Sequence, residues 1–225
     1  ANGISLTGGT TDGNGHHVDL QDFETGLNYS FEVYLKFGSS VDSYERVFDF
    51  GDGTEADNII LQRYGTTSTF WFGTYTGSTK DVEMTNIGTI VSGNLTHLVG
   101  VLGSDGYCSL YQDGTLLGTS TTTSGTPTKT RTNNYIGRTN WTGNNDLDGN
   151  VYYFRVYNTE LTQSDVQRLY TNRETTGLTS SSVPYISDTG KNMAFTNFNA
   201  IGSYITAFSN NYGTSFVDMA TRLGG

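Results

Sequence analysis

Residues 148–170 read DGNVYYFRVYNTELTQSDVQRLY, and this stretch decides the fold. Residues 151–157 show the period of two that indicates a β-strand. One face of that strand would carry Tyr152, Phe154 and Val156, and the other face Val151, Tyr153, Arg155 and Tyr157. Thr162, followed three residues later by Asp165, predicts the start of a short amphipathic helix near 162–172. A strand that runs directly into a helix is therefore expected here.

The same alternation recurs through most of the chain. Its clearest run is 29–37, where Phe31, Val33, Leu35 and Phe37 share one face. Further strands are predicted at 17–23, 45–50, 58–64, 68–75, 97–102, 107–112, 115–119 and 134–138. Asp113-Gly114 favours a tight turn, so 107–119 is predicted to form a hairpin. About ten short strands and one late helix predict an all-β, antiparallel two-sheet sandwich.

The composition changes twice outside these strands. Residues 119–134 are rich in Thr and lack periodicity, which predicts a surface loop or an edge segment. After a break at 177–182, the segment 183–225 is too apolar for a disordered tail. We expect a sandwich domain over 1–176 and a C-terminal extension over 177–225 that packs on the sandwich or on a neighbouring subunit. A late helix over 215–223 is a further expectation.

Charge, the length of apolar runs and cysteine content argue against several classes of protein. The chain has 12 Lys and Arg against 22 Asp and Glu, a net charge of −10, and phosphate binding needs a basic face, so no nucleic-acid partner is expected. No run approaches the roughly 20 apolar residues of a membrane span, which argues against membrane insertion. The single cysteine, Cys108, excludes an internal disulfide and is expected to behave as a small buried residue.

Several segments, in this order, resemble the laminin-G-like, concanavalin-A-like jelly roll. They are GHHVDL (15–20), RVFDFGDG (46–53), LTHLVGVL (95–102), LYQDGTLL (110–117), YIGR (135–138), LDG (147–149) and VYNTEL (156–161). The resemblance covers roughly 1–172 and implies a jelly-roll sandwich. It also implies an extracellular or particle-surface domain that binds a glycan, a cell-surface glycoprotein or another protein, in many members with calcium.

Two acidic loops are candidates for calcium, a hard cation that prefers several oxygen ligands. Residues 49–57 (DFGDGTEAD) and 144–148 (NNDLD) supply the candidate ligands Asp49, Asp52, Asp57, Asp146 and Asp148. The alternative is that these residues only form turns. In the family, the strand after LDG often carries an acidic cation ligand, but this chain has Tyr152 and Tyr153 there. That departure argues against the family's usual calcium site.

Sugar sites combine an aromatic platform with polar hydrogen-bonding groups. The leading candidate is Trp141 with three nearby amides, Asn140, Asn144 and Asn145, and the alternative for Trp141 is a structural role as a loop anchor. A second candidate combines Trp71, Tyr75 and Arg63, although core packing is the favoured interpretation of Trp71.

The acidic residues give no sign of a hydrolase. Glycosidases need two carboxylates across a cleft, whereas Glu32, Glu45, Glu55 and Glu83 are scattered. His97 lies on a predicted strand and is expected to be structural. The sequence therefore predicts a non-catalytic surface recognition domain. The first alternative is a structural component of a virion, fibre or sheath that self-assembles through the extension, and the second is a polysaccharide-active hydrolase.

Overall fold

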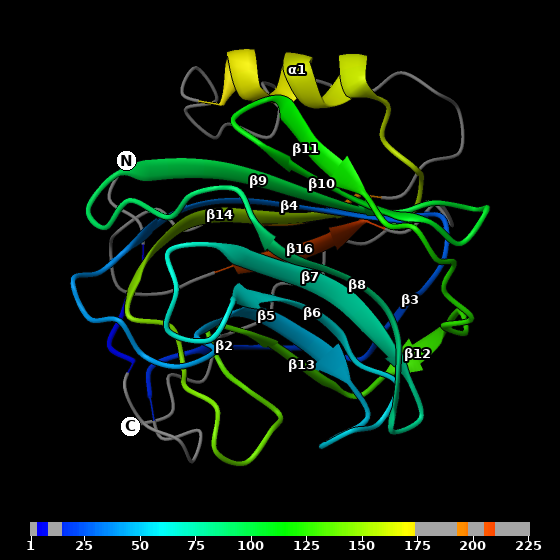
Figure 1. The fold of residues 1–225 in the computed structure, drawn as a ribbon, viewed down its shortest axis with the longest axis horizontal. Helices are drawn as coiled ribbons and strands as arrows, with labels where there is room; N and C mark the ends of the chain where they lie inside the picture. The colour runs from blue at the N-terminus through cyan, green and yellow to red at the C-terminus, as the bar shows by residue number, and fades with distance from the viewer. Residues whose placement is uncertain (1–3, 9–14, 174–192, 198–204, 210–225) are drawn as a thin grey trace.

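The computed structural model describes residues 4–8, 15–173, 193–197 and 205–209 (Figure 1). Over these residues the chain is mostly β, with two antiparallel sheets stacked face to face and one short helix. The predicted all-β jelly-roll sandwich is therefore confirmed. The helix has ten residues, and no helix of the described part is long and apolar enough to cross a membrane.

The first sheet, called sheet A here, has eight strands. Their order is β11 (Thr115–Thr119), β10 (Cys108–Gln112), β9 (Leu95–Leu102), β4 (Tyr29–Phe37), β14 (Gly149–Tyr157), β15 (Met193–Asn197) and β16 (Ile205–Ser209), and β1 (Ile4–Leu6) also pairs with β14. Strands β10 and β11 form the predicted hairpin, and its turn residues Asp113 and Gly114 both have positive φ, 50° and 79°.

The second sheet, sheet B, has six strands. Their order is β2 (Val18–Leu20), β13 (Asn133–Ile136), β5 (Arg46–Gly51), β6 (Ile59–Arg63), β7 (Phe70–Thr76) and β8 (Thr79–Ile87). A small separate ladder pairs β3 (Phe23–Thr25) with β12 (Lys129–Arg131).

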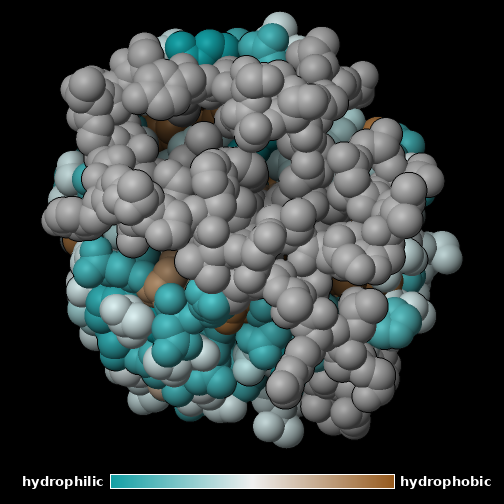
Figure 2. All heavy atoms as spheres, turned by 180° about the vertical axis from the view of Figure 1, so that it is seen from behind, coloured by the Kyte–Doolittle hydropathy of each residue, from teal (hydrophilic) through white to brown (hydrophobic). Residues whose placement is uncertain are grey.

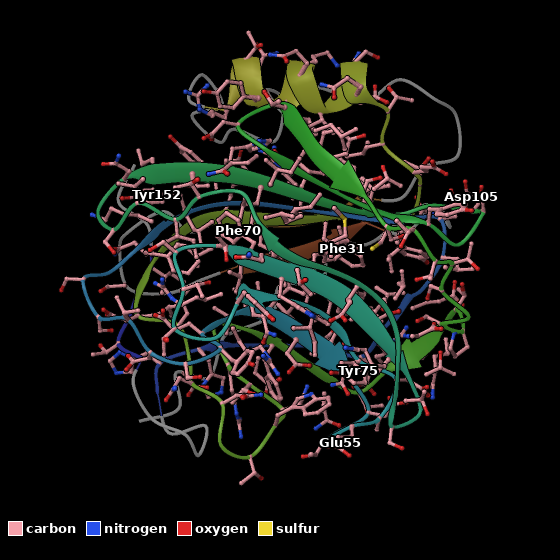
Figure 3. All side chains as sticks on the ribbon, viewed as in Figure 1. Phe31, Glu55, Phe70, Tyr75, Asp105 and Tyr152 are labelled. Carbon is pink, nitrogen blue, oxygen red and sulfur yellow. The ribbon has the colours of Figure 1, made fainter. Side chains whose placement is uncertain are left out.

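Between the sheets lies one large apolar core, to which both sheets contribute alternate residues. Phe31 of β4 and Phe70 of β7 lie in this space (Figure 3). Phe48 and Phe50 stack on each other with ring centroids 4.7 Å apart, and Phe154 meets both edge-on. Each fully buried phenylalanine contributes about 1.5–3 kcal/mol to folding, so this aromatic cluster holds the two layers together.

Part of the outer face of sheet A is covered by helix α1 (Gln163–Asn172), seen above the sheet in Figure 1. The predicted N-cap is confirmed, since the Thr162 hydroxyl accepts from the Asp165 amide and the Asp165 carboxylate accepts from the Thr162 amide. Val166 and Leu169 are buried and join a second apolar cluster on this face of sheet A.

The structure departs from the sequence expectations at β14 and β8. A β-bulge at Tyr152 shifts the register of β14, so Val151 faces the core with Phe154 and Val156, whereas the uniform alternation had grouped it with Tyr153. Strand β8 was not expected, because its outward positions are charged or polar and only Val82 and Met84 are buried. Residues 119–134 contain β12, an edge strand of the small ladder, which agrees with the surface loop or edge segment predicted there.

The C-terminal extension is described only in two segments. Strand β15 pairs with β14 and β16 pairs with β15, so both continue sheet A. The helix predicted over 215–223 lies outside the described residues. The boundary at 176/177 stays a prediction.

Candidate functional site

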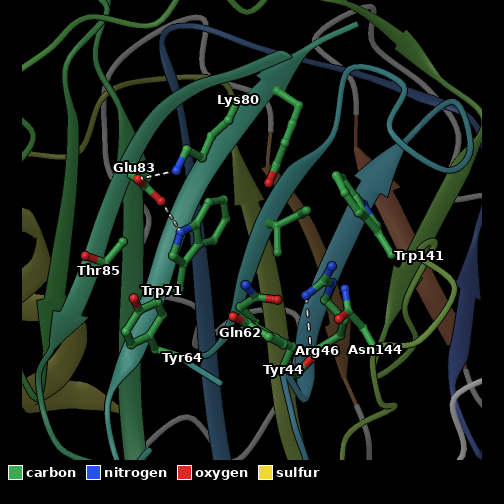
Figure 4. A pocket seen from close by; sticks show the side chains of 12 residues that line it. Tyr44, Arg46, Gln62, Tyr64, Trp71, Lys80, Glu83, Thr85, Trp141 and Asn144 are labelled. Carbon is green, nitrogen blue, oxygen red and sulfur yellow. Dashed lines mark hydrogen bonds and ion pairs between the residues drawn. The ribbon is translucent and has the colours of Figure 1, made fainter. Parts of the chain in front are cut away.

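A cavity of about 420 Å³ opens on the outer face of sheet B, the face turned away from the core (Figure 4). Its position follows from strand alternation: Leu61, Phe70 and Phe72 point into the core, and their neighbours Gln62 and Trp71 point outward. We call this cavity the groove. It is lined by Tyr44, Arg46, Ile60, Gln62, Tyr64, Trp71, Tyr75, Lys80, Glu83, Thr85, Trp141 and Asn144.

Trp71 forms part of the floor of the groove and is only 4% exposed. Its indole Nε1 donates a 2.6 Å hydrogen bond to Oε2 of Glu83 on the adjacent strand β8. Gly73, two residues along β7, leaves room for the ring, since a Cβ there would lie 2.9 Å from Trp71 Cη2 and 2.3 Å from the Val82 carbonyl oxygen. The indole therefore has one fixed position against the sheet.

Tyr75 and Trp141 extend this aromatic surface. The ring centroids of Trp71 and Tyr75 are 6.2 Å apart, and those of Tyr75 and Trp141 are 4.7 Å apart at an interplanar angle of 54°. The Arg46 guanidinium lies 6.0 Å from the Trp141 ring centroid. Three aromatic side chains from β7 and from the loop between β13 and β14 thus form one continuous wall.

Asp49 lies below the groove, fully buried, and holds the two sides of it together. Its Oδ2 accepts from Arg46 Nε and from the backbone amide of Asn140, each at 3.0 Å. Its Oδ1 accepts from the side-chain amides of Asn58 at 2.8 Å and of Asn140 at 3.0 Å. One carboxylate therefore positions both Arg46 and the residue that precedes Trp141.

The charged groups of the groove are paired within it. Lys80 Nζ lies 2.5 Å from Glu83 Oε1, and this hydrogen bond raises the pKa of the Lys80 ammonium. Burial lowers the pKa of Arg46, which its pair with Asp49 opposes. Burial also raises the pKa of the Tyr75 hydroxyl. At neutral pH the groove therefore presents aromatic rings, amides, phenol hydroxyls and two compensated ion pairs.

Of the four residues of the leading sugar-site prediction, two line the groove and two hold the loop that carries them. Trp141 and Asn144 line the groove. Asn140 is bonded to Asp49, and Asn145 Nδ2 donates to the Ser43 carbonyl oxygen at 2.8 Å, so these two amides hold the loop instead.

The two candidate groups lie together in the structure, because Trp71 and Tyr75 line the groove with Trp141. Trp71 is buried, as its predicted core packing requires, but it packs on the outer face of sheet B and outside the apolar core between the sheets. Arg63 is absent from the lining, because its guanidinium bonds the buried Glu45 carboxylate. Sequence reasoning missed Arg46, Gln62, Lys80 and Glu83, and recognising the alternation in β8 would have indicated the last two.

The carboxylates predicted to bind calcium are engaged inside the protein. Lys129 Nζ lies between Asp52 and Asp57, 2.5 Å and 2.9 Å from their carboxylate oxygens, in the place a cation would take. Asp146 accepts from the backbone amides of Gly15 and Thr139.

The fifth candidate, Asp148, accepts from the Ser40 hydroxyl. Across the described residues no group of three His, Cys, Asp or Glu side chains is placed to hold a metal ion. Calcium binding stays a prediction.

These features define the class of the protein as a jelly-roll sandwich with an aromatic groove on one outer face. The chain belongs to the concanavalin A-like lectin/glucanases superfamily, whose model matches residues 12–167. No curated protein sequence matches the chain.

Solved structures with the same fold include three of low sequence identity. A heptameric SAP-like pentraxin from Limulus polyphemus is 16% identical, over 74% of this chain and 80% of that one, with a TM-score of 0.56. Domain 4 of AbnA, a GH43 extracellular arabinanase from Geobacillus stearothermophilus, was solved in complex with arabinotriose. It is 17% identical over 75% of this chain and 82% of that one, with a TM-score of 0.55. The CBM40 of the Ruminococcus gnavus IT-sialidase is 13% identical over 76% of this chain and 97% of that one, with a TM-score of 0.55.

Proposed function

We propose that this protein binds carbohydrate in the groove on the outer face of sheet B. The observation that carries the proposal is the aromatic wall of Trp71, Tyr75 and Trp141, with amide, hydroxyl and charged groups beside it. Aromatic faces pack against the apolar C–H face of a sugar ring, and a few placed polar groups fix its hydroxyls. The arabinanase domain solved with arabinotriose is an instance of this fold in complex with an oligosaccharide.

The proposed role is binding without hydrolysis. Glu83 is the one carboxylate among the residues that line the groove, and it is held by Lys80 and Trp71. Asp49 lies beneath the lining with four hydrogen-bond donors on its oxygens. Glycoside hydrolysis generally needs two carboxylates flanking the scissile bond. A surface glycan or glycoprotein outside the cell or on a particle is the partner this proposal implies.

A glycan array probed with three forms of the full chain tests this function. We expect the wild type to bind a defined subset of glycans and Trp141→Ala to lose at least about tenfold in affinity, since buried aromatic contacts dominate such sites. Tyr107→Ala is the matched control, because Tyr107 is an exposed aromatic residue that does not line the groove. A parallel series with a chelator tests calcium assistance. Absence of any glycan binding, or equal binding by Trp141→Ala, would refute the proposal.

Self-assembly is the second candidate, and one observation favours it. Within the described residues β16 pairs only with β15 and forms an edge of sheet A. Strand edges present unpaired backbone groups that can add a strand from another chain. Light scattering on the full chain tests this role: a molar mass that rises with concentration supports it, and a monomer at every concentration rules it out.

A further inference from the structure

The groove has two cationic side chains, and each already has a carboxylate partner. Arg46 is 2% exposed and pairs with Asp49 at 3.0 Å, and Lys80 pairs with Glu83 at 2.5 Å. Asp49 is fixed in turn by Asn58 and Asn140. An incoming anion therefore meets no unpaired cation among the lining residues.

An acidic ligand would have to break one of these pairs. Displacing Asp49 from Arg46 would leave a carboxylate that is shielded from water without its counter-charge, which is costly. The alternative is Lys80, which is half exposed, but a carboxylate placed beside Lys80 would also lie beside Glu83. Like charges at such a distance repel each other, so neither route favours an anion.

Two unpartnered polar atoms in the lining residues point to the same class of ligand. Gln62 Oε1 and Trp141 Nε1 are buried and have no hydrogen-bond partner among the described residues. The first is an acceptor and the second a donor, so a hydroxyl, which both donates and accepts, can pair with either. A carboxylate can pair only with the indole. Both atoms are shielded from solvent in the structure, so a ligand reaches them only after the side chain turns.

We propose that the groove selects neutral glycans over otherwise identical glycans that carry a uronic or sialic acid. This selectivity rests on the proposed carbohydrate-binding function. It comes from charge compensation within the site, with Glu83 as the group that repels an acidic sugar.

Paired glycans that differ by one uronic or sialic acid residue, measured with the full chain at low and high salt, test the selectivity. We expect the neutral member to bind at least about tenfold more tightly, with little dependence on salt, because no net ion pair forms with it. Glu83→Gln frees Lys80 and should raise binding of the acidic member several-fold. Glu24→Gln removes an exposed carboxylate outside the groove and should leave the ratio of the affinities for the neutral and the acidic glycan unchanged.

The outcomes separate the two proposals. If no glycan of either kind binds, the proposed function itself fails. If acidic glycans bind equally well or better, or Glu83→Gln leaves the ratio unchanged, the function stands and the selectivity is overturned.

Discussion

Glu32 has an environment unlike that of a surface acid. It lies on the outer face of β4, fully buried, and its carboxylate accepts from four side chains, those of His97, Tyr153, Arg155 and Tyr157. Burial alone would raise the pKa of Glu32, but Arg155, His97 and Tyr157 outweigh it and lower the pKa to about 2. A buried charge of this kind is tolerated because it is paired and hydrogen-bonded.

This lowered pKa predicts acid sensitivity. Glu32 stabilises the folded chain fully above its unfolded pKa of 4.5, and the contribution is lost as pH falls from 4.5 towards 2. The shift corresponds to about 3 kcal/mol. Glu32→Gln, which also leaves Arg155 without a counter-charge, should lower the free energy of unfolding at pH 7 by about 3–5 kcal/mol and flatten its decline below pH 4.5. Urea unfolding over a pH series measures both effects.

The matched control is Glu55→Gln, because Glu55 is an exposed carboxylate. It should change the free energy of unfolding by less than about 0.5 kcal/mol. Equal stability of Glu32→Gln and wild type at pH 7 would show that the buried cluster does not contribute as described.

Single residues were predicted well where the local sequence determines their environment. Cys108 is buried as expected, and burial raises the pKa of its thiol to about 11, so it is not a reactive thiolate at neutral pH. Glu32 looked like one scattered acid, since its partner His97 is 65 residues away and the others more than 120. The hydrogen bonds of Asp49 could not be predicted for the same reason: its contact with Asn140, 91 residues away, forms only when the loop between β13 and β14 folds back onto β5.

At the scale of elements, the loop between β13 and β14 determines the shape of the groove. Asn140 is fixed by Asp49, and the Asn140 carbonyl oxygen accepts from the Thr54 hydroxyl at 2.6 Å. Trp141 donates its backbone amide to the Thr139 hydroxyl at 2.8 Å. The loop is thus anchored beside Trp141, so the backbone that carries the indole is held in place before any ligand arrives, and this preorganisation favours affinity.

Asn140→Ala should therefore loosen Trp141 with only a modest loss of overall stability. The substitution removes the side-chain bonds to Asp49 and to the Asn133 carbonyl oxygen but keeps the Arg46–Asp49 pair. We expect a loss of about 1–3 kcal/mol in unfolding free energy, increased acrylamide quenching of Trp141 in a Trp71→Phe background, and weaker glycan binding. Thr142→Ala, at an exposed position in the same loop, is the control. It should leave stability, quenching and glycan affinity as they are in the protein without this substitution. Unchanged quenching in Asn140→Ala would contradict the anchoring role.

Elements were predictable where hydrophobic alternation is strong. Strand β4 was predicted at its observed bounds, and α1 was predicted from its N-cap. Strand β8 was missed because half of its residues face the groove or solvent and are polar. The bulge at Tyr152 was missed because register depends on the partner strand β4, which periodicity within one segment does not reveal.

At the scale of the whole molecule, the two outer faces of the sandwich differ. Helix α1 and the Glu32 cluster close part of the outer face of sheet A, whereas sheet B carries the open groove. The view in Figure 2 is from behind, and the described residues visible there are mainly hydrophilic, with isolated hydrophobic ones between them. The two-sheet arrangement follows from alternating patterns along the chain. The groove does not, because it needs strands and a loop from distant segments to meet on one face.

The most direct measurement uses the two tryptophans of the chain, Trp71 and Trp141, both of which line the groove. A glycan that fills the groove must change their environment. Titration of the full chain with the best array ligand should give a saturable change in tryptophan emission and protection from acrylamide quenching, with the affinity that calorimetry measures. Calorimetric binding of that glycan with emission and quenching unchanged would place the ligand elsewhere and contradict the account.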